Sequence, residues 1–388
     1  MKKLFILLLT VITISIGCRK ENKNIATTLF YSNCQATIDS IQSSDPESVG
    51  IMVHLESPQN NLSWSGCTGY SNKNQKIKLN SDQPALIAST IKPYISATIL
   101  RLEELGLLTL KDPISKHLTE KTIRTFENVG YNFDNIKIKH LLTQTSGIKE
   151  YADRDYIEWI NKNQKHRWTR DEQLRLTASK GKPLGNPEDV WSYSDANFLL
   201  CTEIIESNTK KPFYKAIRKL LKYEDLGFRN TWFPTLEEPN KTTKPLVHQY
   251  WSSWNWDSYD MDPSFDLYGG GGIATTTEEL AKFAFNLFQG NIIEDSTTLN
   301  KIFTKIIPSD GKDTEYLLGL GEGSINEFKY YWHGGFWGTN VLYFPELETS
   351  LAVYVLDKDK SQLVYDQVPN LIVKQLLKHL NINSSDKK

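Results

Sequence analysis

The sequence predicts an α+β protein, an α/β sandwich with one antiparallel sheet built from both chain ends. Helices flank this sheet, and a mostly helical lobe is inserted into it. Strand-like segments near residues 51–70 and 328–356 lie close to the two ends of the chain, whereas the segments between them have mostly helical spacing. The chain has 388 residues and ten Trp, enough length and apolar content for a sizeable core.

The N-terminal residues are typical of a targeting segment. Two lysines precede an apolar run at residues 4–16, which is too short to span a bilayer as a stable helix. The run ends just before Cys18 and a polar stretch, a pattern that resembles a bacterial lipoprotein signal. We expect residues 1–17 to be a signal peptide, Cys18 to be lipidated and residues 18–34 to form a tether. The alternative is an ordinary signal peptide in which Cys18 has no role. Under both interpretations the protein is exported.

The N-terminal part of the sheet is expected as a hairpin. A short helix near residues 29–41 precedes it. Ile51, Val53 and Leu55 alternate, and an Asn-Asn pair separates them from residues 62–70.

A long helix is expected to follow, starting close to Ser89. Pro93 is tolerated only in the first turn of a helix, and Gly106 is the expected cap at its end. Ser89 and Lys92 are three residues apart, so they share one face of this helix and the amine can reach the hydroxyl. The alternative is a serine N-cap beside a solvated lysine.

The remaining elements complete the expected architecture. The lobe is expected at about residues 111–268, and a capping box at Thr276 predicts a helix over 280–288. A final amphipathic helix is expected near 362–380. We expect residues 35–380 to form one domain and residues 381–388 to form a short tail.

Composition excludes some classes of function. Lys plus Arg total 45 and Asp plus Glu total 46, a net charge of −1 that gives no reason to expect nucleic-acid binding. Cys34, Cys67 and Cys201 fix no disulfide framework and lack the spacing of a zinc site. We interpret all three as structural, with Cys201 in a buried helix. A cysteine or metal hydrolase is a third option, which thiol reagents or chelators would reveal.

Two further stretches support a functional interpretation of Ser89 and Lys92. These are residues 191–197, which contain Tyr193, and residues 331–338, which contain His333. With them the chain resembles the serine β-lactamase and penicillin-binding-protein superfamily, nearest to its class C β-lactamase, D,D-carboxypeptidase and esterase branch. The family places a Ser-x-x-Lys helix, a Tyr-x-Asn loop and a Lys/His-x-Gly strand around one cleft, in this order.

The resemblance implies roles for these residues. Ser89 would be the nucleophile, and Lys92 would take part in moving its proton if burial or a second cation favours the neutral amine. Tyr193, beside an ammonium, would act as base and then as acid. His333 would be a cationic or donor residue facing the cleft. Small residues at Gly334 and Gly335 would let the strand approach the substrate, and an amide near Gly335 or Phe336 would join that of Ser89 in an oxyanion hole.

Asp195 departs from the motif, which has Asn there. An ionised carboxylate only accepts hydrogen bonds, and near Lys92 it would pair with the ammonium and weaken it as a base. We therefore expect inefficient β-lactam hydrolysis.

Two stretches allow a second interpretation. Residues 251–268 are rich in aromatics and would either line the mouth of the cleft or pack beneath a long loop. His140 lies in an apolar segment and reads as a packing or capping residue.

The expected function is that of an exported, lipid-anchored serine hydrolase of the cell envelope. It would act on a small ester, amide or peptide substrate of the kind found in cell walls, and it should need no metal or cofactor. A non-catalytic or slowly deacylating penicillin-binding sensor of envelope fragments is the alternative, and Asp195 is the observation that favours it.

Overall fold

A computed structural model describes residues 25–45 and 47–382. The expected signal peptide and the lipidation site at Cys18 lie outside the described residues. Among the residues that are described, no helix combines the length and the apolar character that crossing a bilayer requires.

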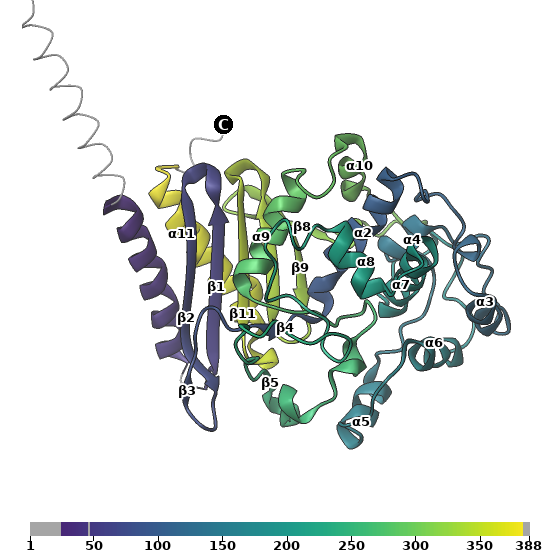
Figure 1. The fold of residues 1–388 in the computed structure, drawn as a ribbon, viewed down its shortest axis with the longest axis horizontal. Helices are drawn as coiled ribbons and strands as arrows, with labels where there is room; N and C mark the ends of the chain where they lie inside the picture. The colour runs from purple at the N-terminus through teal and green to yellow at the C-terminus, as the bar shows by residue number, and fades with distance from the viewer. Residues whose placement is uncertain (1–24, 46, 383–388) are drawn as a thin grey trace, which may run out of the picture.

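A seven-stranded antiparallel sheet forms the centre of the fold and combines both ends of the chain, as predicted (Figure 1). Strand β1 pairs with β2 on one side and with β11 on the other, with Ile51 opposite Val355. The strand order is β3-β2-β1-β11-β10-β9-β8. The strands span β1 Gly50–Ser57, β2 Leu62–Asn72, β3 Ile77–Lys78, β8 Gly321–Ile325, β9 Phe328–Gly335, β10 Thr339–Phe344 and β11 Thr349–Val355.

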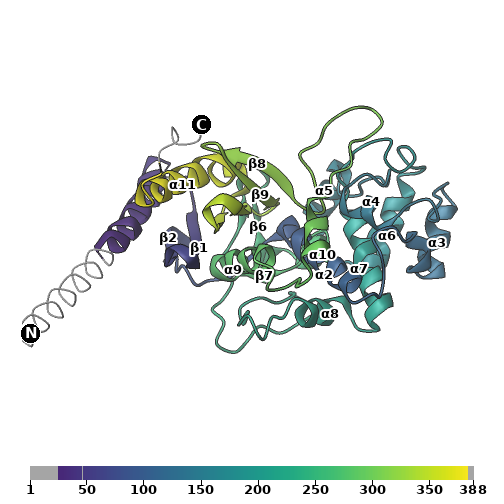
Figure 2. The same ribbon diagram turned by 90° about the horizontal axis from the view of Figure 1, so that it is seen from above.

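The two faces of the sheet are covered by different helices (Figure 2). A helix over residues 25–44 and helix α11 (Val368–His379) cover one face, where alternate residues of β1 such as Val53 are buried against them. Helix α9 (Thr277–Phe288) packs on the other face against β1 and β11. The Thr276 side chain caps α9 by accepting from the amide of Glu279 at 3.1 Å, as its capping-box spacing predicted.

The inserted lobe is helical and falls within the expected span. Helix α2 (Lys92–Glu104) lies between the sheet and the lobe and packs against α7 and α8. The lobe helices are α3 Glu120–Glu127, α4 Ile138–Leu142, α5 Arg154–Lys162, α6 Arg170–Ser179, α7 Asp195–Thr209 and α8 Phe213–Leu220. The other short elements are β4 Ala85–Leu86, β5 Tyr250–Trp251, β6 Trp256–Asp257, β7 Ala274–Thr275 and α10 Ser296–Asn300.

Two sequence-based expectations need correction. The tether expected over residues 18–34 is helical from residue 25, because Phe30 and Cys34 are buried in the core beneath the sheet. Strand β8 was not expected, since its sequence has two glycines and no apolar alternation. Pairing with β9 over its whole length holds β8 in the sheet.

The three described cysteines are free thiols. Burial raises the pKa of Cys34 to about 12 and raises that of Cys201, which lies in α7 as expected. Neither thiol is therefore activated as a nucleophile.

Candidate active site

Ser89 lies where a short 3-10 turn, Ala88–Ile91, runs into helix α2. Pro93 is in the first turn of that helix, as its missing amide hydrogen requires. The residue before the serine, Ala88, has φ of +48°, a left-handed conformation that costs energy for any residue with a Cβ. A strained backbone conformation therefore directly precedes Ser89, which lies at the start of the helix.

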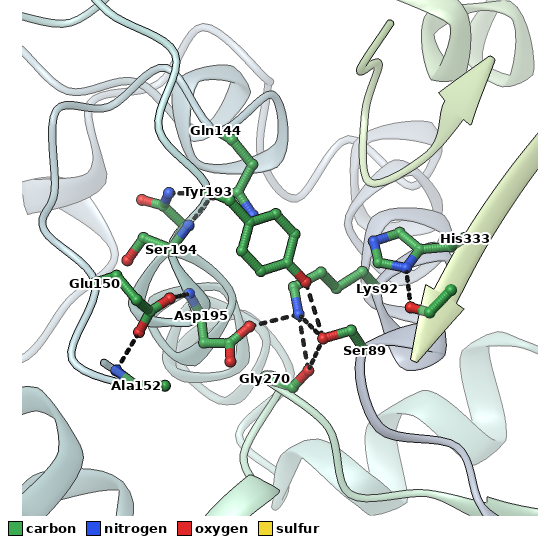
Figure 3. A network of polar contacts seen from close by, with 12 residues as sticks. Ser89, Lys92, Gln144, Glu150, Ala152, Tyr193, Ser194, Asp195, Gly270 and His333 are labelled. Atoms are coloured by element: carbon green, nitrogen blue, oxygen red, sulfur yellow. Dashed lines mark hydrogen bonds and ion pairs between the residues drawn. The ribbon is translucent and has the colours of Figure 1, made fainter. Parts of the chain in front are cut away.

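The hydroxyl of Ser89 contacts three groups from three separate segments (Figure 3). Lys92 Nζ donates to Ser89 Oγ at 2.9 Å, and the Tyr193 hydroxyl donates to it at 2.8 Å. Ser89 Oγ in turn donates to the carbonyl oxygen of Gly270 at 3.3 Å. The structure therefore brings together Ser89, Lys92 and Tyr193, which the sequence placed in one group of motifs. It adds the backbone carbonyl of Gly270, which belongs to a run of four glycines at residues 269–272.

The amine of Lys92 is fully buried and has three acceptors. Besides Ser89 Oγ, these are Asp195 Oδ1 at 2.6 Å and the Gly270 carbonyl at 2.8 Å. Nζ also lies 4.8 Å from the centre of the Tyr193 ring. Three acceptors match the three N–H donors of an ammonium, so this geometry is that of a protonated lysine. The contact between Asp195 and Lys92 that the sequence led us to expect is present.

Tyr193 is a neutral phenol in this environment. Burial, together with the nearby Asp195 carboxylate, raises the pKa of Tyr193 well above its ordinary value. The expectation that the neighbouring ammonium would make its anion accessible is corrected here, because desolvation and Asp195 act in the opposite direction. In the described arrangement the phenol is a proton donor to Ser89.

Two further carboxyl groups line the cleft and had no signal in the sequence. The oxygens of Glu150 accept from the amides of Asp195 at 2.5 Å and Ala152 at 2.7 Å. Burial and the charge of Asp195 raise the pKa of Glu150 to about 8. The same two causes raise the pKa of Asp266 well above its ordinary value. Both groups therefore hold their protons more tightly than ordinary carboxyl groups, and Asp195 is the carboxyl group that contacts Lys92.

His333, on β9, meets the cleft as a neutral imidazole. Its Nδ1 donates to the Gly334 carbonyl at 2.7 Å, which leaves Nε2 to accept from the Tyr316 hydroxyl at 3.2 Å. Burial and the charge of Lys92 lower the pKa of His333 to about 3. Hydrogen-bonding and burial together thus give a neutral group where the resemblance implied a cationic or donor residue.

Strand β9 passes very close to the turn that carries Ser89. A Cβ atom on Gly335 would lie 2.1 Å from the carbonyl oxygen of Ile87, and one on Gly334 would lie 2.3 Å from the Tyr365 ring. At position 335, where the neighbour is backbone of the turn that carries Ser89, only glycine permits this approach. The strand residues expected beside the substrate, Gly334, Gly335 and Phe336, all line the cleft.

The cleft has a volume of about 660 Å³ and is mostly aromatic. Trp251 and Phe265 line it, whereas Trp256 is buried, so the aromatic stretch at 251–268 both lines the cleft and packs beneath it. The cleft is bordered by Ser89, Glu150, Tyr151, Tyr156, Trp191, Tyr193, Asp195, Trp251, Phe265, Asp266, Tyr316, Trp332, His333, Gly334, Gly335, Phe336, Lys358 and Tyr365.

His140 has the capping role that its sequence context suggested. Its Nδ1 accepts from the amide of Lys137 at 3.0 Å, at the start of α4, and its Nε2 faces Glu188 at 2.9 Å. It is absent from the border of the cleft.

Comparison with known proteins identifies the family. A family model described as Beta-lactamase matches residues 51–366, and the chain belongs to this family. PbpX of Bacillus subtilis, named as a penicillin-binding protein, is 26% identical over 311 residues, which cover 79% of this chain and 70% of PbpX.

Solved structures share the fold. A D-stereospecific amidohydrolase from Streptomyces sp. superimposes with a TM-score of 0.73 at 21% identity, covering 90% of this chain and 99% of its own. D-amino acid amidase from Ochrobactrum anthropi SV3, complexed with L-phenylalanine amide, also gives 0.73 at 21% identity, covering 91% and 98%.

Proposed function

We propose that this protein is a serine hydrolase that cleaves amide or ester substrates through an acyl-enzyme on Ser89. The observation that carries the proposal is the hydroxyl of Ser89 at the edge of a cleft, within 2.9 Å of Lys92 Nζ and 2.8 Å of the Tyr193 hydroxyl. Membership in the Beta-lactamase family and the amidases that share its fold support the same reaction class.

The protons can be followed through the acylation step. Lys92 and Tyr193 together are fully protonated in the described geometry, so this pair must lose one proton before it can act as a base. Ser89 Oγ then forms a bond to the substrate carbonyl carbon while its proton passes to Lys92. The bond from that carbon to the leaving nitrogen or oxygen breaks, and the leaving atom takes the proton of Tyr193. A proton from Lys92 then restores the phenol of Tyr193. Deacylation runs the same transfers in reverse: water takes the place of the leaving group and gives a proton to Tyr193, and Ser89 Oγ takes its proton back from Lys92.

The L-phenylalanine amide in the structure of D-amino acid amidase makes amino-acid amides the first substrates to examine. We would measure hydrolysis of an ester, a D-aminoacyl amide, a D,D-peptide and a β-lactam by the wild type and by Ser89→Ala. The proposal requires that at least one compound is hydrolysed by the wild type and not by the variant. Equal rates for the two proteins on every compound would refute it. We expect the β-lactam to be the poorest substrate, because the carboxyl group of Asp195 pairs with the amine of Lys92.

A slowly deacylating penicillin-binding module is the second candidate, and the contact between Lys92 and Asp195 favours it. An adduct that accumulates with a β-lactam and persists for hours, without turnover of any amide or ester, would decide for this candidate.

We also propose that the protein is exported and anchored through Cys18, on the pattern of residues 1–18. Replacement of Cys18 by Ala should move it from the membrane fraction to the soluble fraction, and an unchanged distribution would contradict the anchor.

A further inference from the structure

Lys358 lies at the border of the cleft beside Asp359, whose charge attracts its amine although the two form no ion pair. It lies in the turn after β11, and among the described residues it has no ion pair. Instead its Nζ lies 3.8 Å from the centre of the Trp251 ring and 4.3 Å from that of Phe336. Burial lowers the pKa of Lys358, because the surroundings solvate the ammonium less well than water does. Among the residues bordering the cleft it is the only lysine or arginine.

The backbone around Lys358 is held on both sides. The buried carboxylate of Asp357 accepts from the amide and the hydroxyl of Ser252, and Asp359 accepts from the amide of Ser253 at 2.6 Å and from its hydroxyl at 3.0 Å. These bonds fasten the turn to the segment that follows Trp251. The backbone that carries the ammonium to the border of the cleft is therefore held in place before a ligand binds.

None of the other charged groups that border the cleft forms an ion pair with Lys358. Asp195 is paired with Lys92 at 2.6 Å. Glu150 and Asp266 hold their protons more tightly than ordinary carboxyl groups, and His333 is neutral. An anion that enters the cleft therefore meets one unpaired positive charge.

The position of this charge relative to Tyr193 indicates which half of the substrate it would meet. Tyr193, as the proton donor, must lie beside the leaving group. Its ring neighbours are Tyr316 and His333. Phe336 belongs to a separate group of rings with Trp251 and Phe265. The acyl half, which extends away from the leaving group, therefore lies toward Phe336 and Lys358.

We propose that Lys358 binds a carboxylate carried by the acyl half of the substrate, whose hydrocarbon part packs on Trp251 and Phe336. The preferred substrates would then be amides or esters of a dicarboxylic or acidic acyl group, a specificity that rests on the hydrolase function proposed above.

The test compares three 4-nitroanilide-type compounds. The first is the glutaryl anilide, with the anion on the acyl half; the second is its methyl ester, which is neutral. The third carries a neutral pentanoyl group on 4-aminobenzoate, which puts the anion on the leaving group. Dissociation constants are measured by titration calorimetry on Ser89→Ala protein, so that turnover is not needed, and kcat/KM is measured on the protein with Ser89 intact.

We expect the glutaryl compound to bind about tenfold more tightly than its methyl ester, which corresponds to about 1.4 kcal/mol. Lys358→Met should abolish this ratio and Lys358→Arg should keep it. Lys360→Met is the matched control, because Lys360 lies in the same turn but pairs with Asp45 at 2.7 Å.

An equal ratio of dissociation constants in Ser89→Ala protein with and without Lys358→Met would overturn the inference, and so would an effect of Lys358→Met confined to the aminobenzoate compound. Failure of the hydrolase function would appear separately, as absent turnover of all three compounds while the binding ratio persists.

Discussion

A hydrogen-bonded chain of serine, base and carboxylate lies in the cleft, and a second one lies on the sheet. In the cleft the chain runs from Ser89 through Lys92 to Asp195. On strands β1 and β2, Ser65 Oγ lies 2.7 Å from His54 Nδ1, and His54 Nε2 lies 2.9 Å from Glu56 Oε2. By the usual distances between a nucleophile, its base and an orienting acid, the second chain is as well formed as the first.

Their surroundings differ. Ser65 lies directly opposite His54 in the β1–β2 ladder, in a regular strand. Ser89 follows a residue with positive φ and lies at the start of a helix. It borders a cleft, and Gly335 of strand β9 lies close to the turn that carries it. Neither Ser65 nor His54 borders that cleft. A hydrogen-bonded chain of serine, base and carboxylate therefore does not by itself mark a reactive serine. A strained support and space for a substrate are the distinguishing features.

Removing each serine in turn should give the largest contrast. Ser89→Ala should abolish covalent labelling by a fluorophosphonate, since no hydroxyl remains at the cleft, and Ser65→Ala should leave labelling at the wild-type level. Labelling is measured by gel fluorescence, with the modified peptide identified by mass spectrometry. Loss of labelling in Ser65→Ala, with Ser89→Ala unaffected, would reverse the assignment of the two chains.

The carboxylate at the end of the cleft chain should control pH dependence. Asp195 stabilises the fully protonated Lys92–Tyr193 pair, so it makes the proton of that pair harder to lose. Asp195→Asn should therefore move the acidic limb of the kcat/KM profile to lower pH, by about 1 to 3 units. Glu188→Gln, which removes a carboxylate bonded to Lys139 and His140 outside the cleft, should leave the limb in place. An unchanged limb in Asp195→Asn would mean that its contact with Lys92 does not govern the titration.

The carboxylate of the sheet chain should affect stability and leave activity unchanged. Burial would raise the pKa of Glu56, but hydrogen bonds from His54 and Ser63 outweigh it and lower the pKa. A carboxyl group with a lowered folded-state pKa stabilises the fold above its unfolded-state pKa, and this contribution is lost as pH falls through the folded-state value. Glu56→Gln should therefore cost about 1 kcal/mol in the free energy of unfolding at pH 7.

Urea denaturation at pH 7 and below pH 4 measures this contribution. The difference between wild type and Glu56→Gln should shrink at the lower pH, whereas Glu158→Gln, in an exposed helical pair with Arg154, should cost much less at pH 7. A difference that stays constant on acidification would show that the carboxylate charge of Glu56 does not stabilise the sheet.

Much of the fold was predictable because its signals are local. The alternation at Ile51, Val53 and Leu55, Pro93 after Ser89, and the capping box at Thr276 each specify an element through neighbouring residues. The helix at 25–44 was misread as partly a tether, since the reason for its order is the burial of Phe30 and Cys34 against a distant sheet. The two glycines of β8 likewise conceal a strand that its partner stabilises.

The candidate site was predictable where motif residues occur in a fixed order and unpredictable where only proximity matters. Ser89, Lys92 and Tyr193 belong to such motifs, and they lie in mutual contact. Glu150 accepts from the amide of Asp195 and the carbonyl of Gly270 accepts from Lys92, contacts between distant segments that no motif in the sequence specifies. The protonated state of Tyr193 was also beyond the sequence, because it depends on how deeply the phenol is buried.

The place of β11 has a consequence for how the chain acquires this fold. It is the last strand in the sequence, yet it lies between β1 and β10 and makes the only sheet pairing between the N-terminal hairpin and β8–β10 among the described strands. During synthesis the hairpin must wait for nearly the whole chain before this partner exists, and closing so long a loop carries an entropic cost. A chain shortened by its last forty-five residues would therefore keep every residue that contacts Ser89 and lose the strand that joins the two halves of the sheet.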